Sequence, residues 1–144
     1  MSTLEEKSLG CVQKDGRSTV VNVLDYGKIL TVPGLHLLNG PGNDMVVVIN
    51  LTAAGAHMIL FTTGRGTPLG NPIPTVKIST NSTLAKHKSR WIDFDAGILI
   101  SGADPTETAN TLFQSCMEIA SGKKTKNEQY GYREISIFKD GVTL

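Results

Sequence analysis

Several features that mark particular classes of protein are scarce in this sequence. Its 144 residues include two cysteines, and aromatic residues make up only 6%. Basic and acidic residues almost balance, with 14 Lys and Arg against 13 Asp and Glu. No aromatic residues are interleaved with the modest basic segments, as they would be in a surface that stacks nucleic-acid bases. We therefore expect no nucleic-acid partner.

Long apolar runs are also missing. The longest one worth testing, Met45 to Ile49, stops at Asn50 and is far shorter than the ~20 residues that span a bilayer. The first residues carry two acids and lack the apolar segment of a signal peptide. We expect no membrane partner and a cytoplasmic location. Cys11 and Cys116 show no CxxC spacing, which favours reduced thiols.

The chain does contain alternating apolar and turn-rich segments, and its length suits one domain over 1–144. Helices are predicted over 3–12, 45–54 (capped by Asp44), 83–88 (capped by Asn81 or Ser82) and 105–121. Strands are predicted over 35–38, 58–61, 75–79 and 134–138, the second buried on both faces and the last at a sheet edge. The run 20–24 fits either type. This alternation predicts an α/β domain with a mainly parallel sheet.

Ligands bind at the carboxyl ends of the strands in such sheets, and an unusual segment follows Phe61. It reads Thr62-Thr63-Gly64-Arg65-Gly66-Thr67-Pro68-Leu69-Gly70. Glycines let backbone amides approach an anion, threonines add hydroxyl donors, and Arg65 offers a planar fork for a carboxylate or phosphate. The segment matches neither a Walker A loop nor a dinucleotide fingerprint. It either binds an acidic small molecule or forms a tight turn without a ligand.

Asp93 and Asp95 lie two positions apart in an extended segment between apolar residues. Such a pair can ligate a metal ion through oxygen or act as a general base. Alternatively, Asp95 caps a turn and Asp93 accepts hydrogen bonds from the backbone. A separate basic cluster at 86–90, with Lys123, Lys124 and Lys126, is expected to be a solvated surface.

Six segments together resemble, in order, the C-terminal part of the altronate and galactarate dehydratases, closer to the altronate branch. They are Leu4–Cys11, Gly40–Asp44, Phe61–Pro68, Pro74–Asn81, Trp91–Gly97 and Phe138–Leu144. The resemblance implies a Rossmann-like three-layer fold and a hydro-lyase that removes water from a hexonate or hexarate, giving a 2-keto-3-deoxy acid. It also implies a divalent metal, typically Fe(II).

On this resemblance, Arg65 and Asp93 are the expected catalytic residues, and Asp93 or Asp95 the expected metal ligand. The expected substrate-binding residues are Thr62, Thr63, Gly64, Gly66 and Thr67. Members of this family are longer, so we expect the active site to need an N-terminal part that precedes these residues. A truncated sheet can also expose apolar surface and form a homo-oligomer. The alternative is a non-catalytic α/β module that binds a sugar acid or a partner subunit through the same loop.

Overall fold

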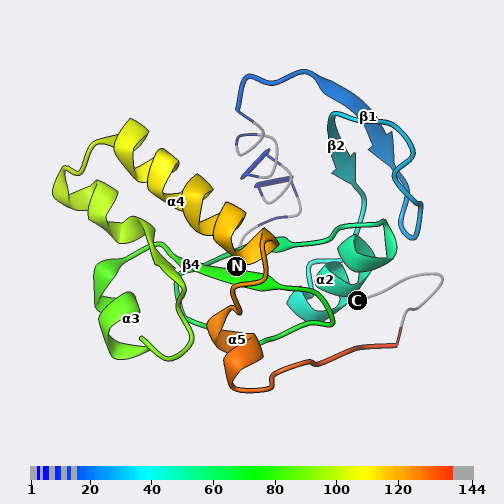
Figure 1. The fold of residues 1–144 in the computed structure, drawn as a ribbon. Coiled ribbons are helices and arrows are strands. Elements are labelled where there is room, and N and C mark those ends of the chain that lie inside the picture. The colour runs from blue at the N-terminus through cyan, green and yellow to red at the C-terminus, as the bar shows by residue number, and fades with distance from the viewer. Residues whose placement is uncertain (1–2, 4, 7–8, 11–12, 14–15, 138–144) are drawn as a thin grey trace.

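Two parallel sheets organise the chain in a computed structural model that describes residues 3, 5–6, 9–10, 13 and 16–137 (Figure 1). In one sheet, β1 (Val20–Leu24) pairs with β2 (Leu35–Leu38). The other sheet has the order β3-β4-β5, with β3 (Ile59–Thr63), β4 (Thr75–Ser79) and β5 (Phe94–Asp95). Every pairing among the described strands is parallel. The predicted α/β class is confirmed, and the undecided run at 20–24 is a strand.

Helices cover both faces of the three-stranded sheet. They are α2 (Asp44–Ala53), α3 (Ser82–His87), α4 (Pro105–Ala120) and α5 (Lys126–Gln129), with a 3-10 helix η1 (Ala96–Ser101). Val76 and Ile78 of β4 pack against Ile119 of α4, whereas Ile59 of β3 packs with Val48 of α2. Since successive strand residues face opposite sides, α4 and α2 lie on opposite faces (Figure 1).

Side-chain caps set the helix starts. Asn43, and not the predicted Asp44, caps α2, because its side chain accepts the N–H groups of Met45 and Val46. The helix therefore begins one residue earlier than predicted. Asn81 caps α3, which decides between the two predicted candidates. Near the start of the chain, Thr3 and Glu6 form the reciprocal hydrogen bonds of a capping box.

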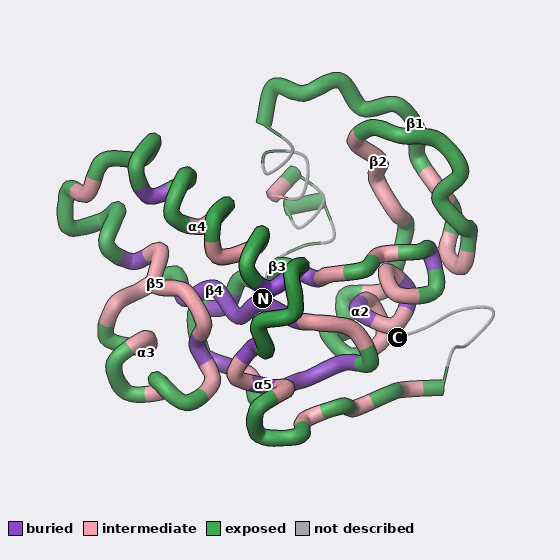
Figure 2. The backbone as a smooth tube through the Cα atoms, viewed as in Figure 1, coloured by how far each residue is buried: buried purple, intermediate pink, exposed green. Residues whose placement is uncertain are grey.

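Burial is concentrated in the central strand (Figure 2). All five residues of β4 are buried. The prediction that the β3 segment is buried on both faces is wrong, since Leu60 is 52% exposed. β3 is an edge strand, and the helix that covers Val76 on its neighbour leaves Leu60 open to solvent. β1 is exposed along most of its length.

The predicted edge strand at 134–138 does not form over its described part, residues 134–137. Ile135 and Ile137 are 70% and 83% exposed. The segment is anchored through a side chain instead, because the Glu134 carboxylate accepts the N–H of Gly70 at 2.8 Å. Phe138, like Cys11, lies outside the described residues.

Two expectations about the rest of the chain can be compared with the structure. Cys116 carries a free thiol, whose pKa is raised by burial. None of the helices in the described ranges is long and apolar enough to cross a membrane.

Candidate functional site

The carboxyl ends of β3, β4 and β5 meet at one edge of the sheet. Thr63 pairs with Ser79, and Ser79 pairs with Asp95. The glycine-rich loop that follows β3, residues 64–70, therefore starts beside the segment that follows β4. Thr80 donates its N–H to the Thr63 carbonyl at 3.1 Å, and the Asn81 side-chain amide donates to the Gly64 carbonyl at 3.3 Å. The parallel topology thus places the loop and Asp95, one of the two predicted carboxylates, at the same edge of the sheet, on either side of β4.

The last residue of β3, Thr63, binds two backbone amides of the loop through its side chain. The Thr63 hydroxyl oxygen accepts the N–H of Arg65 at 3.3 Å and that of Gly66 at 2.9 Å. These two amides are therefore directed at the protein itself. Thr63 and Gly66 are buried, Thr67 is half-buried, and Thr62, Gly64 and Arg65 are exposed. A ligand can reach the three exposed residues and the open part of Thr67.

Lys88 holds the outer side of the same loop. Its Nζ donates to the carbonyl of Arg65 at 2.7 Å and to that of Gly66 at 3.0 Å. Its side chain also packs closely on Gly66, where an added Cβ would lie 2.7 Å from the Lys88 Cδ. The prediction of a merely solvated basic surface is wrong for this residue. The sequence shows only that Lys88 belongs to a basic run, since its partners lie more than twenty positions away.

The two predicted carboxylates have different surroundings. One Asp93 oxygen accepts the N–H of Lys77 and the other that of Lys126, both at 2.8 Å. Burial raises the pKa of Asp93, although these N–H groups oppose that shift. Asp95 accepts the N–H of Gly97 at 2.9 Å and caps η1. These contacts match the alternative prediction that both carboxylates serve the backbone.

Lys77 is a residue that sequence reasoning missed. It is fully buried in β4, and its Nζ lies 3.7 Å from the centroid of the Phe61 ring. That nitrogen has no hydrogen-bond partner among the residues that the structure describes. Burial lowers the pKa of Lys77 to about 8, a shift that Asp44, Asp93 and Glu134 partly oppose. The available signal was a single cation between Val76 and Ile78 in a strand of apolar and β-branched residues.

Comparison with known protein families identifies the whole domain. Residues 1–143 match the family described as D-galactarate/Altronate dehydratase, C-terminal. The chain belongs to this family. The resemblance noted in six segments of the sequence is thereby confirmed.

Individual relatives support this assignment to the galactarate/altronate dehydratase family. The chain is 56% identical, over its whole length, to an altronate dehydratase of Escherichia coli strain K12 and covers 29% of that protein. It is 50% identical over its whole length to an altronate dehydratase of Bacillus subtilis strain 168, again covering 29%. It is 34% identical, over 96% of its length, to a galactarate dehydratase (L-threo-forming) of E. coli K12 and covers 27% of it. The chain therefore spans less than a third of these relatives.

The described side chains of this domain provide few free ligands for a metal ion. Within the described ranges, no three His, Cys, Asp or Glu side chains gather as a metal site. Both Asp93 oxygens and one Asp95 oxygen already accept backbone N–H groups. The two aspartates therefore do not by themselves fit a divalent ion.

Proposed function

We propose that this domain takes part in the dehydration of a sugar acid to a 2-keto-3-deoxy acid. We propose altronate, rather than galactarate, as the substrate. The observation that carries the proposal is the exposed Arg65 on a glycine-rich loop at the carboxyl edge of the sheet. The position agrees with the general rule for ligands of open α/β sheets. The higher identity to altronate dehydratases than to a galactarate dehydratase supports the choice of substrate.

The chemistry explains why an arginine is useful there. A proton next to a carboxylate is weakly acidic, so its removal requires that the enediolate charge be held. The Arg65 guanidinium can hold the substrate carboxylate in a two-point contact while that charge develops. In this proposal Thr62, Gly64 and Thr67 contact the substrate, whereas Thr63 and Gly66 shape the loop.

Asp93 receives a positioning role in this proposal. Its two oxygens bind the backbone of β4, at Lys77, and of α5, at Lys126. The carboxylate therefore joins the central strand to a helix 33 positions further along the chain. In this proposal Asp93 is therefore not the base that removes the substrate proton.

We further propose that the expected divalent metal, Fe(II) in the resemblance, takes its ligands mainly from the remainder of the dehydratase. When bound, such an ion supplies positive charge next to the enediolate. In this chain, the Arg65 guanidinium stabilises the same negative charge of the enediolate. The complete site would thus be shared between this domain and the remainder of the dehydratase. The predicted cytoplasmic location and homo-oligomer stay predictions.

A chimera tests the proposal. These 144 residues replace the matching segment of the E. coli altronate dehydratase, and formation of the 2-keto-3-deoxy acid from altronate is measured with added Fe(II). We expect a kcat/KM within about tenfold of the parent enzyme, and no turnover by the 144-residue chain alone. A chimera that unfolds at the same temperature as the parent yet produces no keto acid would overturn the proposal and favour a non-catalytic module.

A further inference from the structure

A hollow of about 280 Å³ is connected to the glycine-rich loop through two of its lining residues, because Lys88 donates to the Arg65 and Gly66 carbonyls and Tyr132 packs against Gly70. Its lining residues are His87, Lys88, Arg90, Trp91 and Tyr132. Three of them carry basic side chains, two are aromatic, and none is acidic. We call this feature the basic-aromatic hollow. Its volume lies just below the roughly 300–1,000 Å³ of sites for drug-sized ligands, so it suits a ligand smaller than those.

One residue that lines the hollow, Lys88, also holds the glycine-rich loop in place. Lys88, which lines it, donates to the carbonyls of Arg65 and Gly66. The same ammonium group lies 5.1 Å from the centroid of the Trp91 ring. A ligand in the hollow would therefore lie next to the residue that holds the loop at Arg65.

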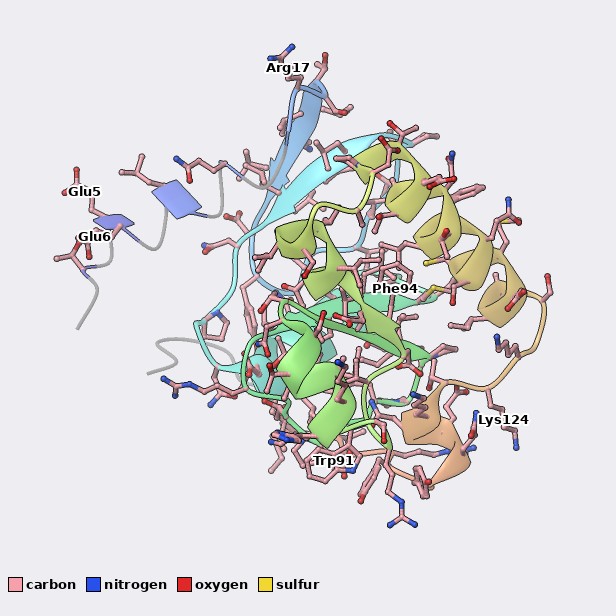
Figure 3. The ribbon with its side chains drawn as sticks, turned by 90° about the vertical axis from the view of Figure 1, so that its left-hand side faces the viewer. Glu5, Glu6, Arg17, Trp91, Phe94 and Lys124 are labelled. Atoms are coloured by element: carbon pink, nitrogen blue, oxygen red, sulfur yellow. The ribbon has the colours of Figure 1, made fainter. Side chains whose placement is uncertain are left out.

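The other walls are held by contacts within the protein. Lys126 Nζ donates to the Ser89 carbonyl at 2.6 Å and fixes the turn between α3 and β5. The Arg90 guanidinium lies 5.6 Å from the centroid of the Tyr130 ring. The Tyr132 backbone N–H donates to the Asn127 carbonyl at 3.0 Å. These contacts hold the residues on three sides of the hollow in place. Figure 3 shows Trp91 near α3 and α5, at the end of the molecule opposite Arg17.

We propose that the basic-aromatic hollow is part of the substrate site and binds the sugar acid, a polyhydroxylated carboxylate. The inference rests on the proposed function and extends its site beyond the loop. Lys88, which donates to the Arg65 carbonyl, and Arg90 add to the positive charge that Arg65 offers the single carboxylate. The Trp91 ring offers an apolar face to the carbon chain of the ligand. A competing explanation is that basic residues at the end of α3 only complement the helix dipole.

Trp91 allows a direct test because it is the single tryptophan of the sequence. The 144-residue chain is titrated with altronate while Trp91 fluorescence is followed, and binding is checked by calorimetry. A neutral hexitol of the same carbon number serves as the control ligand. We expect a saturable change with altronate and none with the hexitol. No fluorescence change and no heat with altronate would overturn the inference.

Two charge-matched variants decide between the explanations. Arg90→Ala and Lys86→Ala each remove one exposed cation from the same basic segment. Of the two residues, only Arg90 lines the hollow. Loss of one charge-assisted hydrogen bond corresponds to a roughly ten- to hundredfold weaker affinity. We expect that loss for Arg90→Ala and less than a twofold change for Lys86→Ala. Equal weakening in both variants would overturn the inference in favour of a general charge effect.

The outcomes also separate this inference from the proposed function. An active chimera whose isolated domain shows no Trp91 response would remove the hollow from the site and leave the dehydratase function standing. An inactive chimera with a specific Trp91 response would remove the function and leave sugar-acid binding in the hollow.

Discussion

The ammonium group of Lys77 lies over the ring of Phe61, 3.7 Å from its centroid, between the two neighbouring strands β3 and β4. The negative face of an aromatic ring attracts a cation, but this replaces only part of the hydration that a buried amine loses. The central strand of the sheet therefore carries a charge that lowers the stability of the fold at neutral pH.

Replacement of Lys77 by methionine should stabilise the domain at pH 7, because Met fills a similar space without a charge. The lowering of the Lys77 pKa from 10.5 to about 8 corresponds to a cost on the order of 3 kcal/mol. The whole of this loss of stability applies below pH 8, because Lys77 is protonated there in both the folded and the unfolded state. Between pH 8 and 10.5 the unfolded state binds more protons, so wild-type stability rises with pH.

Urea unfolding of both proteins at pH 7 and pH 10 measures this effect. The free-energy advantage of Lys77→Met should shrink by roughly 2 kcal/mol or more over this range. Lys86→Met, at an exposed position, is the control and should change the free energy of unfolding at pH 7 by no more than about 0.5 kcal/mol. A Lys77→Met advantage that stays constant from pH 7 to pH 10 would contradict the assignment of a buried, charged amine.

A second prediction concerns the two aspartates. Asp93→Asn should lower the free energy of unfolding by about 1–3 kcal/mol, because the amide nitrogen would face one of two backbone donors. Asp95→Asn should cost only a few tenths of a kcal/mol, since asparagine is also a good N-cap. Both are measured by urea unfolding at pH 7. Equal costs for the two variants would contradict the distinct roles assigned to them.

A third prediction concerns the packing of the loop beneath Lys88. Gly66 and Gly131 have nearly the same positive φ, 74° and 77°, but only Gly66 lacks room for a Cβ. Gly131→Ala should cost about 1 kcal/mol for backbone strain. Gly66→Ala should cost a further 1–2 kcal/mol, because Lys88 must move away from its carbonyl partners. Thermal unfolding of the two variants tests this, and equal melting temperatures would refute it.

Local patterns predicted two of the three strands of the central sheet. Periodicity and turn residues located β3, β4 and α4, whereas β5 was not among the predicted strands and its residues were expected only to be extended. The N-cap of α2 was predicted one residue too late. Asn43 and Asp44 are both good N-cap residues, so the sequence alone does not distinguish them.

Contacts between distant parts of the chain could not be predicted in this way. Lys88 reaches Arg65 across 23 positions, and Glu134 reaches Gly70 across 64. The first contact turns a surface lysine into a support for the loop, and the second takes the place of the expected edge strand. Neither follows from residue type or spacing, because each depends on how separate elements pack.

The proposed function depends above all on Arg65, and the kinetics of Arg65→Ala in the chimera measure its contribution. The Arg65 side chain is exposed, so its removal should leave the melting temperature within about 2 °C of the parent chimera. Arg17→Ala, at an exposed position at the end of the molecule opposite Trp91 (Figure 3), is the matched control. We predict that Arg65→Ala lowers kcat/KM for altronate at least a hundredfold, about 2.7 kcal/mol of transition-state stabilisation, while Arg17→Ala stays within twofold. Wild-type kcat/KM in the Arg65→Ala chimera would contradict the account.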